Sequence, residues 1–496
     1  MNTNVRKFKE WLGSHKNVQE YVRPVVLKPK SGKLPAGLRG TYYKCGPGEF
    51  DAYGSRVAHP YDGDGYVSAF TFDTSGSVTY RARLVATQHS DAEQRQKKRL
   101  FSGAFGTPPH FRAPKNPANT SVVEWGAPGK ERLLVFCESG APYMLDPVTL
   151  ETLGTLPPFK EGMPLETNVP WMNRLLRDHN IFGDAVCAHP KIVACAGGNA
   201  RGDRLVFFTL AFNGSSTTVR FFELDRDFNV CSETPYKING YLYMHDFVVT
   251  PTHYVFVQHP LKLNMQNLKH GIVNCVEMAS DASTPSLIRA IPRPSNENPS
   301  DFAMEIVPGF ITHHAHLCWS VASPGIIDLF SVLYDSNINF NSMAEMTEGC
   351  LYHIRWNMEA HTITQRRCSN RWIEFPTSDD IGNIIATMSS GSQVQQCLVR
   401  SNVGSVAASN VFGRWDLWDA GEEKLISEPV ISGSGSGSSS GAGGYVMTVI
   451  HDSQENHSYV AVFEKYYIWR GPIAEFWLPE AVPPGLHGMW SDRVHV

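Results

Sequence analysis

Four short segments contain the histidines best suited to bind a transition metal. They read Ala-His-Pro-Lys at 188–191, Met-His-Asp-Phe at 244–247, Thr-His-His-Ala-His at 312–316 and Leu-His-Gly at 486–488. Imidazole is a ligand for iron, zinc, copper and nickel, and spacing does not choose among them. Consecutive candidates, counted from His189 through His313 to His487, lie 56, 68 and 174 residues apart, which excludes a local metal motif. Only a fold that brings distant elements to one point would make them a single site.

Strand-length runs of apolar or alternating residues recur along the chain. They predict a β-rich fold, which could bring the distant histidines together. Examples are residues 66–72, 133–137, 205–210, 219–224, 254–258, 351–356, 446–450 and 459–463. Turn-forming clusters separate many of these runs at a spacing of roughly ten residues, which is typical of an all-β sandwich, barrel or propeller. In a propeller the inner strands converge on a central axis, so residues from different blades can surround one ion.

The chain divides most simply into an N-terminal arm and one large domain. Residues 1–28 are expected to form the arm, whose apolar positions Val5, Phe8 and Trp11 fit one face of an amphipathic helix. Residues 29–496 are expected to form the one large all-β domain. The Gly/Ser-rich stretch 432–444 is short enough to be a flexible loop within that domain rather than a linker.

The composition is that of a folded, turn-rich protein. Of 496 residues, 42% are hydrophobic and 19% charged, with 41 Gly, 32 Pro and a formal net charge of -4. This balance gives no reason to expect a nucleic-acid partner. The ten cysteines are scattered and never spaced CxxC, which indicates reduced thiols in an intracellular compartment. Without an apolar run of membrane-spanning length or a secretory signal, we expect a protein that is soluble or attached peripherally to a membrane.

Nine segments, taken in order, resemble the successive motifs of the carotenoid cleavage oxygenase family. They lie at 34–43, 46–48, 59–65, 138–143, 188–191, 244–247, 374–376, 427–429 and 486–488. The first reads Leu-Pro-Ala-Gly-Leu-Arg-Gly-Thr-Tyr-Tyr and the third His-Pro-Tyr-Asp-Gly-Asp-Gly. The resemblance covers nearly the whole chain. It implies a seven-bladed β-propeller with a dome of helices and loops on one face, and one non-haem Fe(2+) ion held on the axis by four histidines.

The resemblance also assigns the iron ligands. His189, His245 and His487 match the first, second and fourth ligand motifs. The third motif departs from the family's usual Phe-His-x-x-Asn, because this chain reads Thr-His-His-Ala-His there. Aligning the first histidine makes His313 the third ligand and leaves His314 and His316 as alternatives. His314 would point away from the axis if His313 pointed toward it, since strand side chains alternate between faces.

The resemblance also implies three glutamates that hydrogen-bond the ligand histidines through the ring nitrogen that does not bind the metal. The resemblance pairs Glu138 with His245, Glu374 with His313, and Glu428 with His487. A carboxylate that accepts the second N–H of a ligating imidazole fixes the tautomer and orientation of that ring. The sequence leaves open the alternative that each glutamate is an ordinary surface residue.

The function implied by the resemblance is an Fe(2+)-dependent dioxygenase. It would use O2 to cleave a conjugated C=C bond of a lipophilic polyene, a carotenoid or apocarotenoid, to aldehyde or ketone products, with no catalytic residue beyond the metal site. A stilbene-cleaving dioxygenase would share the fold, but such relatives carry a lysine directly before the glutamate of the fourth motif, where this chain has Cys137. A retinoid isomerohydrolase, or a non-catalytic propeller that binds an apolar ligand, would also be compatible with these motifs. A plastid location fits a photosynthetic source.

One segment has the composition of a membrane contact through which such a substrate could enter. It combines basic with apolar side chains: Lys97, Lys98, Arg99, Leu100, Phe101 and Phe105. Basic residues attract anionic headgroups while apolar ones enter the interface, so the segment predicts peripheral membrane association. The alternative is a solvated loop with a few packed aromatic residues.

Overall fold

The computed structural model describes residues 14–495 with gaps. The gaps are 111, 113, 162–184, 195–201, 279–284, 295–300, 307–310, 320–324, 335–348, 369–371, 379–382, 390–396, 403–414, 422–423 and 433–443. For the strand at 311–319 and for most residues of the strands between 372 and 402, only the backbone is described. The expected helix near the N-terminus and most of the Gly/Ser-rich loop 432–444 therefore lie outside the described residues.

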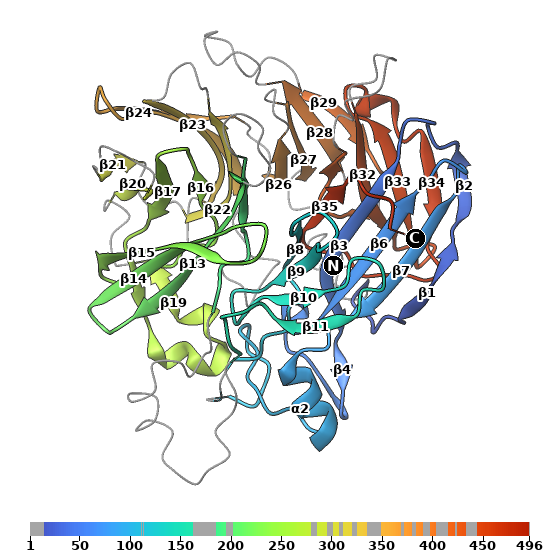
Figure 1. The fold of residues 1–496 in the computed structure, drawn as a ribbon, viewed down its shortest axis with the longest axis horizontal. Coiled ribbons are helices and arrows are strands. Elements are labelled where there is room, and N and C mark those ends of the chain that lie inside the picture. The colour runs from blue at the N-terminus through green and yellow to red at the C-terminus, as the bar shows by residue number, and fades with distance from the viewer. Residues whose placement is uncertain are drawn as a thin grey trace, which may run out of the picture.

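Within the described residues, the strands form seven sheets of four or more strands and two small hairpin-like sheets. The larger sheets follow one another along the chain and are arranged around a common centre (Figure 1). The expected all-β class is therefore confirmed.

The first four large sheets take most of their strands from the N-terminal part of the chain. In spatial order they are β1 (Tyr21–Val26), β7 (Val78–Leu84), β6 (Asp64–Phe72), β3 (Gly40–Glu49) and β35 (Gly488–Ser491); β11 (Thr152–Thr155), β10 (Tyr143–Leu145), β9 (Arg132–Phe136) and β8 (Ser121–Trp125); β12 (Lys191–Val193), β13 (Arg204–Phe212), β14 (Ser216–Leu224) and β15 (Val230–Asn239); and β16 (Val248–Val249), β17 (His253–Gln258), β20 (Ser286–Pro292) and β21 (Phe302–Ile306).

The other three large sheets come from the C-terminal part. They are β22 (Ile311–Trp319), β23 (Ile326–Tyr334), β24 (Gly349–Asn357) and β25 (Thr362–Arg367); β26 (Trp372–Ser378), β27 (Asn383–Ser389), β28 (Cys397–Asn402) and β29 (Trp415–Asp419); and β2 (Lys28–Gly32), β34 (Ala474–Trp477), β33 (His457–Glu464), β32 (Tyr445–Asp452) and β30 (Lys424–Ile426), with β31 (Val430–Ile431) also paired to β32. The small sheets pair β4 (Asp51–Ala52) with β5 (Ser55–Arg56), and β18 (Leu261–Leu263) with β19 (Val276–Met278).

Neighbouring sheets meet at their inner strands. β12 contacts β16, β16 contacts β22, β22 contacts β26, β26 contacts β31, β31 contacts β35, and β35 contacts β8. From β8, the Ser121 hydroxyl donates a hydrogen bond to the Ala188 carbonyl just before β12. These contacts run once around the centre, and every predicted metal ligand lies on one of these strands or at most three residues before it.

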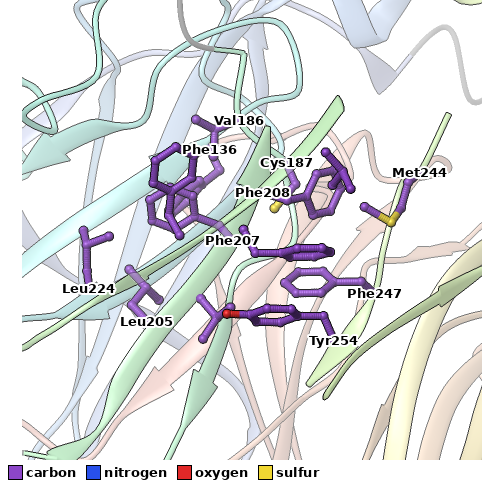
Figure 2. Packing of buried hydrophobic residues seen from close by; sticks show 14 of the residues in the cluster. Phe136, Val186, Cys187, Leu205, Phe207, Phe208, Leu224, Met244, Phe247 and Tyr254 are labelled. Carbon is purple, nitrogen blue, oxygen red and sulfur yellow. The ribbon is translucent and has the colours of Figure 1, made fainter. Parts of the chain in front are cut away.

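Aromatic side chains fill the space between adjacent sheets. Phe221 of β14 stacks on Tyr254 of β17, with ring centroids 4.1 Å apart and ring planes inclined by 6°. Figure 2 shows Phe207, Phe208 and Phe247 gathered in the same cluster, which joins the sheets of β8–β11, β12–β15 and β16–β21. Each fully buried aromatic or aliphatic side chain contributes roughly 1.5–3 kcal/mol to folding. Burial between the sheets therefore holds the inner strands at fixed positions around the centre.

The two ends of the chain close the ring. β35, near the C-terminus, pairs antiparallel with β3, while β2, near the N-terminus, pairs antiparallel with β34. β1 pairs with β7 in the first sheet, so residues 21–26 of the expected arm 1–28 belong to a sheet. The position of β35 matters for the site because His487 directly precedes this strand.

The helices described are few and short. They are α2 (Gln88–Gln96) and the 3-10 helices η1 (Pro60–Asp62), η3 (Met265–His270), η4 (Val273–Cys275) and η6 (Ile468–Arg470). α2 begins after Thr87, whose hydroxyl accepts a hydrogen bond from Ser90 N, and is followed by the C-cap residue Lys97, which is left-handed with φ 50°. In Figure 1, α2 projects beside the β4–β5 hairpin at the lower side of the molecule. Among the described residues, no helix combines the length and apolarity needed to cross a membrane.

Candidate metal centre

Three of the four predicted ligands lie just before inner strands. His189 precedes β12, His245 precedes β16, and His487 precedes β35. β12 contacts β16, and β35 contacts β8, whose Ser121 holds the Ala188 carbonyl beside His189. The sheets therefore deliver the three histidines, which are far apart in sequence, to one place at the centre of the ring.

The imidazole of His189 lies against those of His245 and His487. Nε2 of His189 and Nε2 of His245 are 2.9 Å apart. The centroid of the His189 ring lies 4.5 Å from the ring centroids of both His245 and His487. Two nitrogens bound to one ion at about 2.1 Å and at right angles to each other are separated by about 3.0 Å. The spacing of His189 and His245 therefore fits two neighbouring ligands of a single metal ion.

Glu138 holds the His245 ring through its other nitrogen, as predicted. Glu138 Oε1 lies 2.7 Å from His245 Nδ1. When Nδ1–H donates to this carboxylate, Nε2 is left unprotonated and able to bind a metal. Burial alone would lower the pKa of His245, but the negative charge of Glu138 and its hydrogen bond outweigh burial and raise it. The same charge makes the imidazole a stronger donor to a metal.

Glu428 does the same for His487 and also binds the following backbone. Its Oε1 lies 2.8 Å from His487 Nδ1, and its Oε2 accepts a hydrogen bond of 2.8 Å from Gly488 N. Burial raises the pKa of Glu428, but the neighbouring His487, through its charge and hydrogen bond, overcomes this and lowers it. Both carboxylate oxygens are thus used to orient the segment that carries the ligand.

The predicted third ligand lies on the strand between the second and fourth positions. His313 belongs to β22, which contacts β16 on one side and β26 on the other. Glu374 belongs to β26. The side chains of His313, of its alternatives His314 and His316, and of Glu374 lie outside the described residues, so their pairing stays a prediction.

The donor set fits a divalent transition metal. Imidazole nitrogens with their Nδ1 positions held by carboxylates are typical of such sites, and neutral ligands leave the charge of the ion intact. In the part of the chain that the structure describes, no group of three or more His, Cys, Asp or Glu residues is by itself arranged to hold an ion. His189 and His245 lie with their Nε2 atoms next to each other, and the ring of His487 lies beside that of His189.

An ion pair that the sequence analysis did not predict joins the first two ligand segments. Lys191 Nζ lies 2.7 Å from Asp246 Oδ1, and the Asp246 side chain is only 2% exposed. Lys191 follows His189 by two residues and Asp246 directly follows His245, so the pair fixes the spacing between the two ligands. Both residues stand inside the histidine motifs quoted from the sequence. A lysine two residues after His189 and an aspartate directly after His245 were the sequence features that could have predicted this ion pair.

The segment predicted to contact a membrane is only partly exposed. Lys97 and Lys98 are exposed beyond the end of α2. Arg99 instead turns back to the β4–β5 hairpin, where its guanidinium donates to the Phe50 and Ser55 carbonyls at 3.1 and 3.2 Å. Arg99 therefore anchors the hairpin rather than facing a lipid surface.

The aromatic residues of that segment point inward, which corrects the prediction. Phe101 is 2% exposed and stacks on His89 with ring centroids 3.9 Å apart. Phe105 is half-buried and stacks on His59 at 4.8 Å, and Leu100 is half-buried as well. Because α2 supplies the ring that covers Phe101, this side chain packs the helix against the body and is not available to a membrane.

Replacing Glu428 by glutamine should weaken metal binding while the fold persists. Glutamine keeps the shape but loses the charge that orients His487, and a change of this kind costs about 10- to 100-fold in metal affinity. Fe(2+) dissociation constants from chelator competition would measure the loss. Asp328→Asn is the matched control, because Asp328 accepts from His353 at 2.7 Å in another sheet. Equal affinities in the wild type and Glu428→Gln would contradict the role of Glu428.

Comparison with known proteins assigns the chain to a family. The family model described as Retinal pigment epithelial membrane protein matches residues 15–492. The apocarotenoid-15,15'-oxygenase of Synechocystis sp. is 25% identical over 97% of this chain and 96% of its own length. The isoeugenol monooxygenase of Pseudomonas nitroreducens is 25% identical over 93% and 94%, and the carotenoid cleavage dioxygenase 7 of Oryza sativa subsp. japonica is 26% identical over 96% and 89%.

Solved structures share the fold along nearly the full length of the chain. A Glu150Gln mutant of Synechocystis apocarotenoid oxygenase has a TM-score of 0.79 at 24% identity, covering 97% of this chain and 98% of its own. A cobalt-substituted form of the Synechocystis protein also has a TM-score of 0.79, at 23% identity. Because the family model spans nearly all of the chain, this protein belongs to the family of the retinal pigment epithelial membrane protein and the carotenoid cleavage oxygenases.

Proposed function

We propose that this protein is an Fe(2+)-dependent dioxygenase that cleaves a conjugated C=C bond of a carotenoid or apocarotenoid. The observation that carries the proposal is the meeting of His189, His245 and His487 at the centre of the ring, with carboxylates on two of them. The relative named apocarotenoid-15,15'-oxygenase, which matches 97% of this chain, supports the substrate class. Bound iron would supply the binding and activation of O2 beside the double bond.

The residues of the chain need to do little proton chemistry in such a reaction. One C=C bond and one O2 molecule give two carbonyl products, so both oxygen atoms are consumed and no leaving group requires a proton. What the protein must supply is a fixed ligand set and a polyene held at the correct distance from it. The carboxylates Glu138 and Glu428 serve the first need by fixing His245 and His487.

The residue before Glu138 argues against a stilbene substrate. A phenol-binding lysine is expected at this position in stilbene-cleaving relatives, whereas Cys137 here is buried, with its Sγ 3.2 Å from the Ser139 hydroxyl. Burial raises the pKa of the Cys137 thiol, so this side chain carries no charge near neutral pH. It cannot replace an ammonium group in holding a phenolate.

Product mass spectrometry tests the proposal. Fe(2+)-loaded protein would be incubated in air with β-carotene, long and short apocarotenals, a retinyl ester and a hydroxystilbene, beside an anaerobic sample. We expect oxygen-dependent aldehyde or ketone fragments from a carotenoid or apocarotenoid, whose masses locate the bond. Fragments from the stilbene alone, isomerised retinol, or no product from iron-containing protein would each contradict the proposal and favour, respectively, a stilbene-cleaving enzyme, an isomerohydrolase or a non-catalytic binding protein.

We infer further that a membrane surface meets the molecule beside the end of α2. Lys97 and Lys98 are exposed there. The loop after them reaches η3 and η4, since Val273 N donates to the Ala104 carbonyl, and the exposed apolar residues of that region are Met265 and Ile272. Met265 and Ile272, rather than the buried Phe101, are therefore the apolar side chains that can enter the membrane interface.

Neutralising these lysines should weaken binding to anionic vesicles. Each basic residue near such a surface contributes about 1 kcal/mol, so Lys97→Gln with Lys98→Gln should reduce binding on the order of 30-fold. Co-sedimentation with phosphatidylserine-containing liposomes measures this. Lys130→Gln with Lys237→Gln, two exposed lysines on other sheets, is the charge-matched control. Equal loss in both double variants would show only a general charge effect and would exclude this surface.

A further inference from the structure

A lysine is buried behind the turn that carries His487. Lys44 lies on β3 and is 4% exposed. Its Nζ donates a hydrogen bond of 2.9 Å to the Leu486 carbonyl. Removing an ammonium group from water costs several kcal/mol, so a neutral side chain would fill this position more cheaply if packing were the sole requirement. The location of the charge therefore calls for an explanation.

The chain around Lys44 is built to bring that charge to the turn. An ideal Cβ on Gly485 would lie 2.7 Å from Lys44 Cε and 2.9 Å from Lys44 Cγ, so the lysine stem occupies the space that any larger residue at 485 would need. Cys45 completes the contact through its backbone, because its N–H donates to the His487 carbonyl and its carbonyl accepts from Leu486 N, both at 2.8 Å. Two consecutive residues of β3, Lys44 and Cys45, therefore hydrogen-bond the turn that carries His487.

The other side of the turn is held by Glu428. Its two oxygens bind His487 Nδ1 and Gly488 N, each at 2.8 Å. Lys44 is also close enough to contribute to the lowered pKa of Glu428, while burial lowers the pKa of Lys44 itself to about 8. A cation on one side and an anion on the other therefore enclose the residues that present the imidazole.

We propose that Lys44 is a positioning residue of the metal centre, which holds the His487 turn through the Leu486 carbonyl and places a positive charge beside Glu428. The proposal rests on the proposed function, because it takes His487 as a metal ligand. Lys44 acts on the ligand through its neighbours and has no contact with substrate in this role. Its removal should therefore change how the metal is bound more than it changes the stability of the fold.

Co(2+) is a suitable probe, since it is stable in air and its visible absorption reports coordination geometry. Co(2+) affinity would be measured by chelator competition in the full-length wild type, Lys44→Met, Lys44→Arg and the control Lys30→Met. Lys30 is a partly buried lysine on β2 that pairs with Glu475 at 2.9 Å, away from His487. Urea unfolding of the metal-free proteins would run in parallel.

We expect Lys44→Met to bind Co(2+) about 10-fold more weakly and with a shifted visible spectrum, whereas Lys44→Arg recovers most of the affinity. Lys30→Met should match the wild type in both readouts. If Lys44→Met does not fold, Lys44→Gln, which also lacks the charge, replaces it with the same expectation. Wild-type affinity and spectrum in the neutral variant would overturn the role of Lys44. Failure of the wild type to bind Co(2+) would instead reject the proposed metal centre.

Discussion

Replacing either His245 or His487 by alanine should abolish retention of iron. Each ring is a proposed ligand of the iron, and each has a carboxylate partner at 2.7 or 2.8 Å that is left without its imidazole when the ring is removed. After loading with Fe(2+) and desalting, the wild type should retain about one iron per chain and each variant almost none. Metal analysis of the desalted proteins measures the difference directly.

The matched control for these variants is His353→Ala. His353 is also a buried histidine paired with a carboxylate, since its Nε2 lies 2.7 Å from Asp328 Oδ1. It lies on β24, the third strand of its sheet, rather than at the centre of the ring. His353→Ala should therefore keep its iron even if it loses stability. Normal iron content in His245→Ala or His487→Ala would remove that histidine from the ligand set.

The largest stability effect is expected at Lys115, which lies between two buried carboxylates. Its Nζ is 2.7 Å from Asp64 and 2.8 Å from Glu93 of α2, and the side chains of all three residues are less than 10% exposed. Burial lowers the pKa of Lys115, but the two carboxylates outweigh burial and raise it. Lys115→Met would leave both carboxylates without their cation, and breaking a buried ion pair in this way costs about 3–5 kcal/mol.

Equilibrium urea unfolding measures this cost. Lys130→Met is the control, because Lys130 is 75% exposed and lies 3.8 Å from a partner, Asp227, that is 61% exposed. An exposed pair of this kind contributes about 0–1 kcal/mol. If Lys115→Met lowered the free energy of unfolding no more than Lys130→Met, the buried cluster would not be what fastens α2 to the body.

The proposed metal ligands could be picked out from sequence because each stands in a short motif, and the structure brings the side chains of His189, His245 and His487 close together. His189, His245 and His487 share no local spacing, yet each lies one to three residues before a strand, and the fold brings the starts of these strands close together. Glu138 and Glu428 were predictable for the same reason, since a ligating imidazole needs a partner for its second nitrogen.

Other features could not be predicted because they depend on contacts between segments distant in sequence. Phe101 belongs to a basic and aromatic stretch that resembles an interfacial loop, but the ring of His89 on α2 covers it. Lys44 stands in a strand where a lysine usually faces water. Its burial depends on Leu486, which lies 442 residues away and reaches β3 only when the C-terminal strand closes the ring.

The most direct test of the account is the fate of the two atoms of O2. The Fe(2+)-loaded protein would be given 18O2 and its cleaved substrate in brief incubations, and the carbonyl products would be reduced at once to alcohols to prevent exchange with water. A dioxygenase places one labelled atom in each of the two fragments, and that is the result expected here. Label in one fragment only would make the protein a monooxygenase, and unlabelled fragments would show that O2 does not attack the double bond.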